Sequence, residues 1–498
     1  MSIRLTRRTM IGAAGASLFA PAIAAAPTSP AFSWDMLQAE ALKRARQPYV
    51  APPAPPAGLD AVTYDALNHI SYRADAALWR GTPQEVRFFP QSRNAQAGVP
   101  VSVVERGGAR ALPFTRELFA GGERLPPTAN GFSGFRVMMP GGNSDWLAFQ
   151  GASYFRASGA LDQYGLSARA LAIDTGLSTP EEFPSFTHFW LEQGPGDAVT
   201  IYALLDSPRA AGAWRFVNRR GPQGVTQDVS CVLQLRADVA RLGIAPLTSM
   251  FWYGEGDRDK AVDWRPEIHD SDGLAMLTGG GERIWRPLRN PKATQVNSFA
   301  DRAPKGFGLL QRDRNFDHYQ DDGVFYEKRP SLWVEPQGDW GAGSVMLVEL
   351  PTTRETEDNI VACWSPEGPA RAGRRYSLSY RLRWIAGEPN AQGVARVVDT
   401  WRGVAAAPGF EPVKGASRVV VDFAGDALKG FDRASGVAPN VSADHGKVLT
   451  ANAYPVVGTS NRWRLIADVA PDSDRAVDLR AFLHRSGAAL TETFLYQL

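Results

Sequence analysis

The chain has 498 residues, of which 44% are hydrophobic and 21% charged, the composition of an ordinary globular protein long enough for two domains. Its formal net charge is +2, but segment 1–26 contains Arg4, Arg7 and Arg8 and no acid, so the remainder carries 51 basic (54 − 3) and 52 acidic residues, or −1. A near-neutral protein gives no electrostatic reason to expect nucleic acid or an anionic membrane surface as a partner.

The N-terminal segment 1–26 predicts an export signal. Residues 6–11 (TRRTMI) resemble a twin-arginine motif, and a short apolar run follows over residues 10–20. Small residues at 22–24 and 24–26 suit signal cleavage. The apolar run is shorter than the roughly 20 residues that a membrane span needs. We therefore expect residues 1–26 to be removed and the mature protein to be periplasmic, without stable membrane insertion.

Beyond the signal, the sequence predicts one short helix followed by many strands. Residues 32–46 place Leu37, Leu42 and several alanines on one helical face, and a Pro/Ala-rich leader occupies 48–58. A second helix is predicted around residues 230–242. Short β-type runs broken by Gly, Pro and Asn include residues 84–89, 101–104, 198–205 and 344–350. Strands this short and closely spaced favour a sandwich of large twisted antiparallel sheets.

A change in composition divides the chain near residue 385. Residues 385–394 (IAGEPNAQGV) are rich in turn formers, and about 100 residues of alternating strands follow, the size of an immunoglobulin-like sandwich. The sequence thus predicts an all-β protein. Its parts are a large N-terminal β-sandwich over 27–385, a linker or lid over 386–397, and a small C-terminal immunoglobulin-like β-sandwich over 398–498.

One stretch, residues 149–192, alternates aromatic rings with arginines, carboxylates and glycines. Sugars stack their C–H faces on rings while their hydroxyls need fixed donors and acceptors, so this pattern is typical of a carbohydrate groove. The rings are those of Tyr154, Phe155, Tyr164, Phe183, Phe186, Phe189 and Trp190.

Three further segments, residues 264–273, 306–341 and 355–360, combine carboxylates with loop character. Cleavage of a glycosidic bond needs one protonated carboxylic acid and a second carboxylate that acts as nucleophile or base. The segments offer more candidates than the reaction needs, and the residue pattern leaves the choice open because most loop acids form turns or pair with arginine. The candidates are Asp270, Asp272, Asp313, Asp321, Asp322, Glu327, Glu335, Asp339, Glu355, Glu357 and Asp358.

The cysteines and histidines give no metal motif. Cys231 and Cys363 are 132 positions apart (363 − 231), which leaves a disulfide open, although the apolar surroundings of Cys363 favour a buried free thiol. The six histidines are scattered, and neither CxxC nor HExxH occurs. We therefore expect no metal site and no cofactor.

The 149–192 stretch, EIHDSDG (267–273) and ETEDNI (355–360) resemble the family of periplasmic osmoregulated glucan biosynthesis proteins G and D. The resemblance extends from Tyr64 through the C-terminal domain and is strongest over residues 149–364. It implies a mutarotase-like N-terminal sandwich, an immunoglobulin-like C-terminal domain and action on β-1,2-linked glucan. The twin-arginine signal favours the D branch, and similar proteins often form homodimers.

The resemblance also implies roles for individual residues. Asp358 looks like the family's general acid and Asp270 like its general base, with Tyr326 and Thr356 in a proton relay through a substrate hydroxyl and water. Neutral hydroxyls suit such a relay because each one both donates and accepts. Candidate substrate-binding residues are Trp190, Trp252, Trp333, Trp340, Arg156, Arg312 and Asp272, the alternative for each aromatic residue being a place in the core.

The expected function is an anomer-inverting glycoside hydrolase, an endo-β-1,2-glucanase. Its acid, Asp358, must be protonated near neutral pH, and burial beside Trp364 or repulsion from Glu355 or Glu357 would raise its pKa. The first alternative is an inverting β-1,2-glucan transglycosylase that cyclises its product, a choice on which the lid bears. The second is a non-catalytic glucan-binding assembly factor, which would need aromatic platforms but not Asp358.

Overall fold

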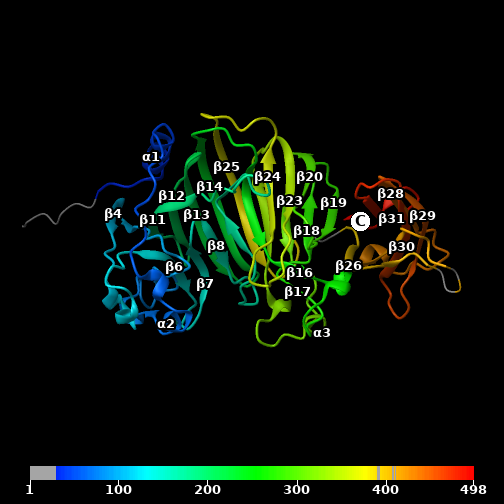
Figure 1. Ribbon diagram of the computed structural model, residues 1–498, viewed down its shortest axis with the longest axis horizontal. Helices are drawn as coiled ribbons and strands as arrows, with labels where there is room; N and C mark the ends of the chain where they lie inside the picture. The colour runs from blue at the N-terminus through cyan, green and yellow to red at the C-terminus, as the bar shows by residue number, and fades with distance from the viewer. Residues whose placement is uncertain (1–29, 390–392, 407–408, 410) are drawn as a thin grey trace, which may run out of the picture.

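A computed structural model describes residues 30–389, 393–406, 409 and 411–498, without the side chains of residues 258 and 259. The predicted export signal and part of the predicted lid lie outside these residues. The described chain is an elongated stack of β-sheets running from its N-terminal part to its C-terminal part (Figure 1). The predicted all-β sandwich class is confirmed.

The first large sheet has ten strands among the described residues. In spatial order they are β2 (Val86–Pro90), β6 (Phe132–Met138), β7 (Asp145–Gln150), β8 (Tyr154–Ala157), β9 (Ser167–Arg169), β15 (Leu242–Ser249), β24 (Ile360–Pro366), β23 (Ala342–Glu349) and β20 (Gln295–Arg302), with β10 (Leu171–Ile173) also paired to β15.

The second large sheet has fifteen strands within the same described ranges. Its order is β28 (Ala438–Asp444), β31 (Asp478–Arg485), β33 (Thr493–Gln497), β19 (Arg283–Pro287), β18 (Gly273–Leu277), β21 (Gly306–Leu310), β22 (Ser331–Gln337), β25 (Arg375–Ile385), β14 (Gly224–Leu235), β13 (Ala210–Gly221), β12 (Val199–Asp206), β11 (Ser185–Gln193), β3 (Val101–Glu105) and β4 (Gly108–Ala111), with β32 (Ala488–Ala489) beside β31.

Smaller sheets and short helices complete the described chain. The remaining strands form the pairs β1 (Ser71–Tyr72) with β5 (Phe119–Ala120) and β16 (Phe251–Tyr253) with β17 (Ile268–His269), and the four-stranded sheet β26 (Arg396–Val404), β27 (Ser417–Ala424), β30 (Arg462–Pro471) and β29 (Gly446–Pro455). The α-helices are α1 (Trp34–Ala45), α2 (Tyr64–Asn68) and α3 (Phe316–Tyr319). The 3₁₀ turns are η1 (Leu59–Ala61), η2 (Ala74–Ala76), η3 (Arg116–Leu118), η4 (Gly122–Arg124), η5 (Glu255–Lys260), η6 (Tyr326–Lys328) and η7 (Asp426–Leu428).

The two large sheets face each other across an aromatic core. Phe149 of β7 stacks on Phe135 of β6 at 5.3 Å and meets Phe216 of β13, in the opposite sheet, edge-on at 5.2 Å. Part of the aromatic 149–192 stretch belongs to this core, since Phe155, Phe186 and Phe189 are buried in it. Tyr154 and Phe183 remain at the surface side, where they flank an arginine.

The first predicted helix is confirmed as α1. Ser33 caps it by accepting a 3.2 Å hydrogen bond from the Met36 N–H, and Leu37, Ala41 and Ala45 are its buried face. The helix packs against β12 and β13 at one end of the molecule (Figure 1). None of the described helices is long and apolar enough to cross a membrane.

The second predicted helix, residues 230–242, is wrong. Residues 230–235 are the end of β14, which pairs with β13 on one side and β25 on the other. Apolar residues at 232, 233, 235, 239 and 242 imitate helical spacing, but hydrogen bonds to two neighbouring strands decide the conformation. Cys231 in this strand and Cys363 in β24 are both buried and free, so no disulfide joins them.

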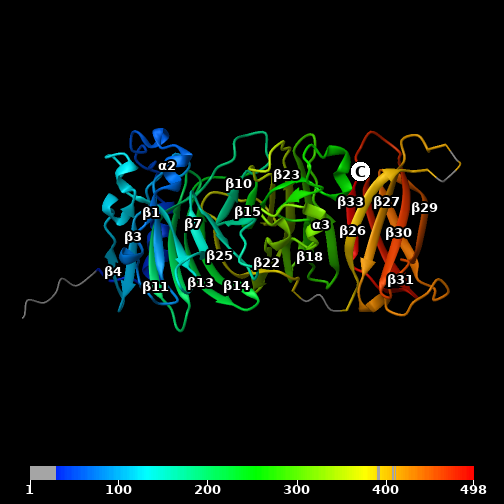
Figure 2. The same cartoon turned by 90° about the horizontal axis from the view of Figure 1, so that it is seen from below.

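The C-terminal strands are continuous with the larger sheet. β33 lies parallel to β19, with Thr493 opposite Ile284, and their neighbourhood shares a core in which Trp285 and Trp333 pack with residues such as Phe494. The proposed boundaries at 385 and 398 stay a prediction. Four of the strands after Ile385, namely β26, β27, β30 and β29, build a sheet of their own, and Figure 2 shows it at the far end of the molecule.

Candidate active site

The loop between β23 and β24 carries Asp358 and is held by two buried asparagines. Asn359 accepts a 2.8 Å hydrogen bond from the Phe251 N–H and donates to the carbonyls of Phe251 and Leu350, both at 2.9 Å. Asn290 accepts from the Thr352 N–H at 3.0 Å and donates to the Thr352 carbonyl at 2.8 Å. The loop is therefore fixed at both ends although it has no regular structure.

Replacement of Asn359 by alanine should lower the free energy of unfolding by about 1–3 kcal/mol, because it leaves buried backbone groups without partners. Urea denaturation measures this loss, with Asn452→Ala as the control, since Asn452 is exposed. Because the same change frees the loop next to Asp358, activity on glucan should fall further than the loss of folded protein explains. Equal stability of the two variants would contradict the role given to Asn359.

Asp358 has two arginines nearby. Its side chain remains accessible to solvent, yet protein surrounds it enough that burial raises the pKa of its carboxyl group, while the positive charges of Arg169 and Arg156 oppose that rise. Arg169 is held between the rings of Tyr154 and Phe183, with its guanidinium carbon 4.9 and 5.3 Å from their centroids.

The predicted causes of that raised pKa need correction. Burial is the cause, as expected, but Trp364 is fully enclosed in the core and the charges acting on Asp358 are those of arginines rather than of Glu355 or Glu357. Arg156, a predicted substrate-binding residue, is exposed and stacks over Tyr164 at 4.8 Å. It therefore presents a positive charge close to the candidate acid.

Asp270 belongs to a second cluster, formed by β17 and η6. Its N–H donates to the Met250 carbonyl at 2.8 Å, and its carboxylate forms an ion pair with Arg329. The Arg329 guanidinium lies 4.0 Å from the centroid of the Tyr326 ring, so one arginine contacts both the candidate base and the candidate relay residue. Arg329 also lies within electrostatic range of Arg156, which connects this cluster to the surroundings of Asp358.

Tyr326 and Glu355 extend this cluster to the loop that carries Asp358. The Tyr326 hydroxyl donates to Glu355 Oε2 at 3.2 Å, and Arg265 contacts the same oxygen at 2.8 Å. Burial, aided by the Glu355 charge, raises the pKa of Tyr326, so its hydroxyl stays neutral and able to both donate and accept. Thr356, one residue along, is exposed, and its hydroxyl has no hydrogen-bond partner within the described chain.

A buried glutamine, Gln311, which the sequence did not single out, supports the cluster that contains Tyr326. Gln311 is fully enclosed, and its amide nitrogen lies at 3.2 Å from the His269 carbonyl, 3.1 Å from the Tyr319 hydroxyl and 3.0 Å from the Tyr326 carbonyl. Arg329 was also missed. The one feature of the sequence that could have identified Arg329 is that it lies three residues after Tyr326. No local pattern identifies Gln311.

Two of the predicted aromatic platforms, Trp333 and Trp340, lie in the core in this structure, which corrects those predictions. Trp333 is 1% exposed, and Trp340 packs against Trp364 and Tyr380 while its indole nitrogen donates to the Ser379 carbonyl at 3.2 Å. Trp190 stacks on His188 at 3.8 Å and on Phe32, near α1. Trp190 and Trp252 are both half-buried, and Trp252 packs beside the Tyr326 cluster, so a substrate-binding role for these two stays a prediction.

Arg312 and Asp272, two further predicted substrate-binding residues, have structural partners instead. Arg312 forms ion pairs with Glu492 at 2.6 Å and Glu388 at 2.8 Å and lies flat on the Trp285 ring. Asp272 accepts backbone hydrogen bonds from Arg312 and Asp313, and burial raises its pKa to about 6. Arg312 therefore links the segment after β21 to the C-terminal strands, and Asp272 fixes the backbone of that segment.

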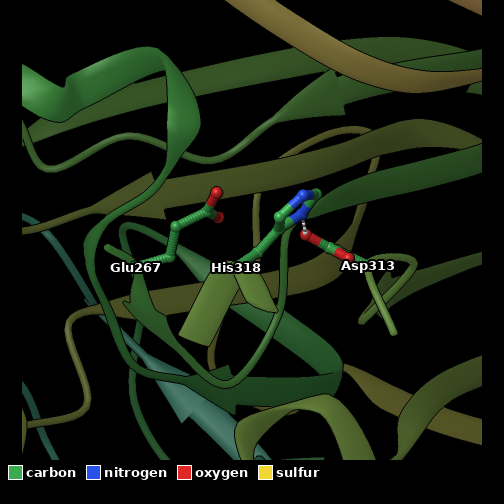
Figure 3. Close-up of side chains that lie close together, drawn as sticks. All are labelled: Glu267, Asp313 and His318. Carbon is green, nitrogen blue, oxygen red and sulfur yellow. Dashed lines mark hydrogen bonds and ion pairs between the residues drawn. The ribbon is translucent and has the colours of Figure 1, made fainter. Parts of the chain in front are cut away.

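A polar cavity of about 700 Å³ lies beside Arg312. Glu267, Asp313 and His318 line it, and their ligand atoms all lie within 4.8 Å of one another, the one such group of possible metal ligands among the described residues (Figure 3). This group of possible metal ligands includes neither Asp358 nor Asp270.

The chain is similar over nearly its whole length to proteins of one family. The family model described as "Periplasmic glucan biosynthesis protein, MdoG" matches residues 32–498. A probable glucans biosynthesis protein D of Shewanella oneidensis is 45% identical over 491 residues, covering 95% of this chain and 90% of the relative. Glucans biosynthesis protein D 2 of Ralstonia nicotianae is 42% identical, covering 99% and 97%. Glucans biosynthesis protein D of Stenotrophomonas maltophilia is 44% identical, covering 94% and 89%.

Proposed function

The chain belongs to the MdoG family of periplasmic glucan biosynthesis proteins, and on that premise we propose that it is an anomer-inverting endo-β-1,2-glucanase. Its part in periplasmic glucan biosynthesis follows from the family, whereas the hydrolytic reaction, the β-1,2 linkage and export through the twin-arginine route are our proposal. The observation that carries the proposed reaction is that two carboxyl groups on connected loops have different surroundings. Burial raises the pKa of Asp358, whereas Asp270 forms an ion pair with Arg329.

Asp358 has the properties of a general acid. Burial raises the pKa of its carboxyl group while one side stays open to solvent and ligands, so it can hold a proton and reach a glycosidic oxygen. Arg156 and Arg169 temper the rise, which keeps the group able to release that proton.

Asp270 has the properties of a general base, because its ion pair with Arg329 suits the carboxylate form. Proton transfer from the attacking water would pass through a substrate hydroxyl and the hydroxyls of Tyr326 and Thr356. Tyr326 supports this role as a neutral buried phenol, and Thr356 as an exposed hydroxyl that is free to contact water or sugar. A relay of this length suits inversion, since the two carboxyl groups of inverting enzymes stand far enough apart to admit water.

The pH profile should report the proton of Asp358. Because the acid must be protonated, kcat/KM is expected to fall as the pH rises through the raised pKa of Asp358. Arg156 lowers that pKa, so the Arg156→Gln variant should shift the falling limb to higher pH. The control is Arg110→Gln, at an exposed arginine on β4. A higher KM with an unchanged limb would instead leave Arg156 as a binding residue only.

Product analysis tests the proposal against its two alternatives. Linear β-1,2-glucan is incubated with the mature protein, and the products are analysed by mass spectrometry and by NMR of the newly formed anomeric centre. Shorter chains that have gained one water and begin as the α-anomer support the hydrolase. Products one water lighter than linear chains of equal length would mean a cyclising transglycosylase. Bound but unchanged glucan would leave a non-catalytic assembly factor.

A further inference from the structure

Glu267, Asp313 and His318 converge from two segments of the chain, because Asp313 and His318 both lie on the segment that follows β21. Glu267 comes just before β17, Asp313 follows β21, and His318 lies in α3. His318 Nδ1 is 2.5 Å from Asp313 Oδ2, and Figure 3 shows the Glu267 carboxylate beside this pair. Metal–ligand bonds of about 2.0–2.2 Å hold donor atoms roughly 3–4 Å apart, so small side-chain rotations would bring this set, now within 4.8 Å, onto one ion.

Glu267 differs from the other buried carboxylates in having no permanent cation beside it. Among the described residues, each of the others has an arginine or lysine nitrogen within 4.0 Å, as charge burial requires. Glu267 is 3% exposed, and its one ion-pair partner among the described side chains is His269, at 3.0 Å, which is charged only when it is protonated. Those others are Glu85, Asp174, Asp257, Asp270, Asp321, Glu327, Glu349, Asp422, Asp468 and Glu492.

The cavity gives access to the site and carries charges of both signs, because Arg312, Arg314, Arg396 and Arg462 also line it. Glu255 and Asp399 line the same cavity of about 700 Å³, which is wide enough for a hydrated ion. Asp399 pairs with Arg462, but within the described residues Glu255 has no arginine or lysine within 4.0 Å and accepts only from the Thr400 N–H. Among the described side chains, Glu255, Glu267 and Asp313 are thus the carboxylates of this cavity without an arginine or lysine nitrogen within 4.0 Å, and the arginines that line it pair with other acids or lie further away.

We propose that Glu267, Asp313 and His318 bind one divalent transition-metal ion, of the Zn²⁺ or Mn²⁺ class. One imidazole and two carboxylates suit these ions better than Mg²⁺ or Ca²⁺, which prefer oxygen ligands alone. The ion would exchange the His318–Asp313 hydrogen bond for coordination and join α3 to the loop before β17. Its role is to stabilise the segments that carry Gln311 and Tyr326, and it takes no part in cleaving glucan.

The test is metal binding by the full mature protein in the absence of glucan, so it is independent of the proposed reaction. Protein freed of metal with EDTA is titrated calorimetrically with ZnCl₂ and with MnCl₂. We expect one saturable site for at least one of the two metals and a metal-dependent rise in Tm. The affinity should fall by about 10- to 100-fold or more in Glu267→Gln and in His318→Ala.

The matched control is His445→Asn, at an exposed histidine whose φ of 59° asparagine tolerates. It should bind metal as the unchanged protein does. Circular dichroism establishes that the variants fold, and anomalous scattering from metal-soaked crystals locates the ion. The proposal is overturned if neither metal saturates a site below about 1 mM, a limit well above the affinity of structural sites. Binding that survives both substitutions would likewise place the metal elsewhere.

Discussion

Asp358→Asn is expected to lower kcat on linear β-1,2-glucan by about 100- to 10,000-fold, the contribution of a well-placed general acid. The amide has nearly the shape of the carboxyl group but holds no acidic proton for the leaving oxygen. Binding should persist, because Arg156 and Arg169 remain in place. The rate is measured from new reducing ends, and binding by calorimetry with the inactive variant.

The matched control for this prediction is Glu357→Gln, an equally isosteric change one residue away. Glu357 is exposed, and among the described residues its carboxylate contacts only Thr352 and Arg354, so the control should keep most of its activity. Asp270→Asn should lose activity as Asp358→Asn does, since the base is then missing. If Asp358→Asn keeps more than half of the original rate while Glu357→Gln is inactive, the wrong carboxyl group has been assigned.

Arg312→Met is expected to destabilise the fold by about 3–5 kcal/mol, because it leaves buried carboxylates without their shared cation. Glu388 would keep Arg283 and Arg396, but Glu492, whose side chain is 1% exposed, would keep only backbone donors such as the Val397 N–H. The guanidinium also loses its contact with the Trp285 ring, 3.7 Å away. Urea denaturation and Tm measure the effect.

Arg371→Met is the control for that prediction, since its ion pair with Asp238 is exposed on both sides. Such pairs contribute about 0–1 kcal/mol, so this variant should unfold almost as the unchanged protein does. The comparison also decides between two roles for Arg312. If Arg312→Met weakens glucan binding at unchanged stability, the interpretation as a substrate-binding residue is right and the structural role is wrong.

Much of the fold could be predicted from local patterns, because most of those patterns agree with the hydrogen bonding that the chain adopts. Residues 84–89 and 198–205 alternate as strands do and become β2 and β12, and Ser33 before an apolar face starts α1. Residues 230–242 fail because β14 is central in its sheet, where β13 and β25 outweigh its own helical spacing. The continuity of β33 with β19 depends on contacts between distant residues, which no local pattern contains.

The candidate site was predictable to a different extent. The family resemblance supplies the proposed roles of Asp358, Asp270, Tyr326 and Thr356. Interactions of Glu355, Arg329 and Arg156 connect the segments that carry these residues. The sequence does not show, by contrast, whether a tryptophan side chain faces the core or the surface. Trp333 and Trp340 could therefore be assigned equally to a groove or to the core. The groups that fix the site, such as Arg329, Gln311 and Asn359, are single polar residues whose partners lie far away in the sequence.

The parallel pairing of β33 with β19 has a consequence for synthesis. Thr493 leaves the ribosome long after its partner Ile284, so until then β19 is an open edge with unpaired backbone groups. Pairing over such a separation closes a long loop and is slow, and the nascent chain meanwhile offers that edge to other chains. We therefore expect the fold to close late, after translation, with β33 as the segment whose arrival ends the aggregation-prone interval.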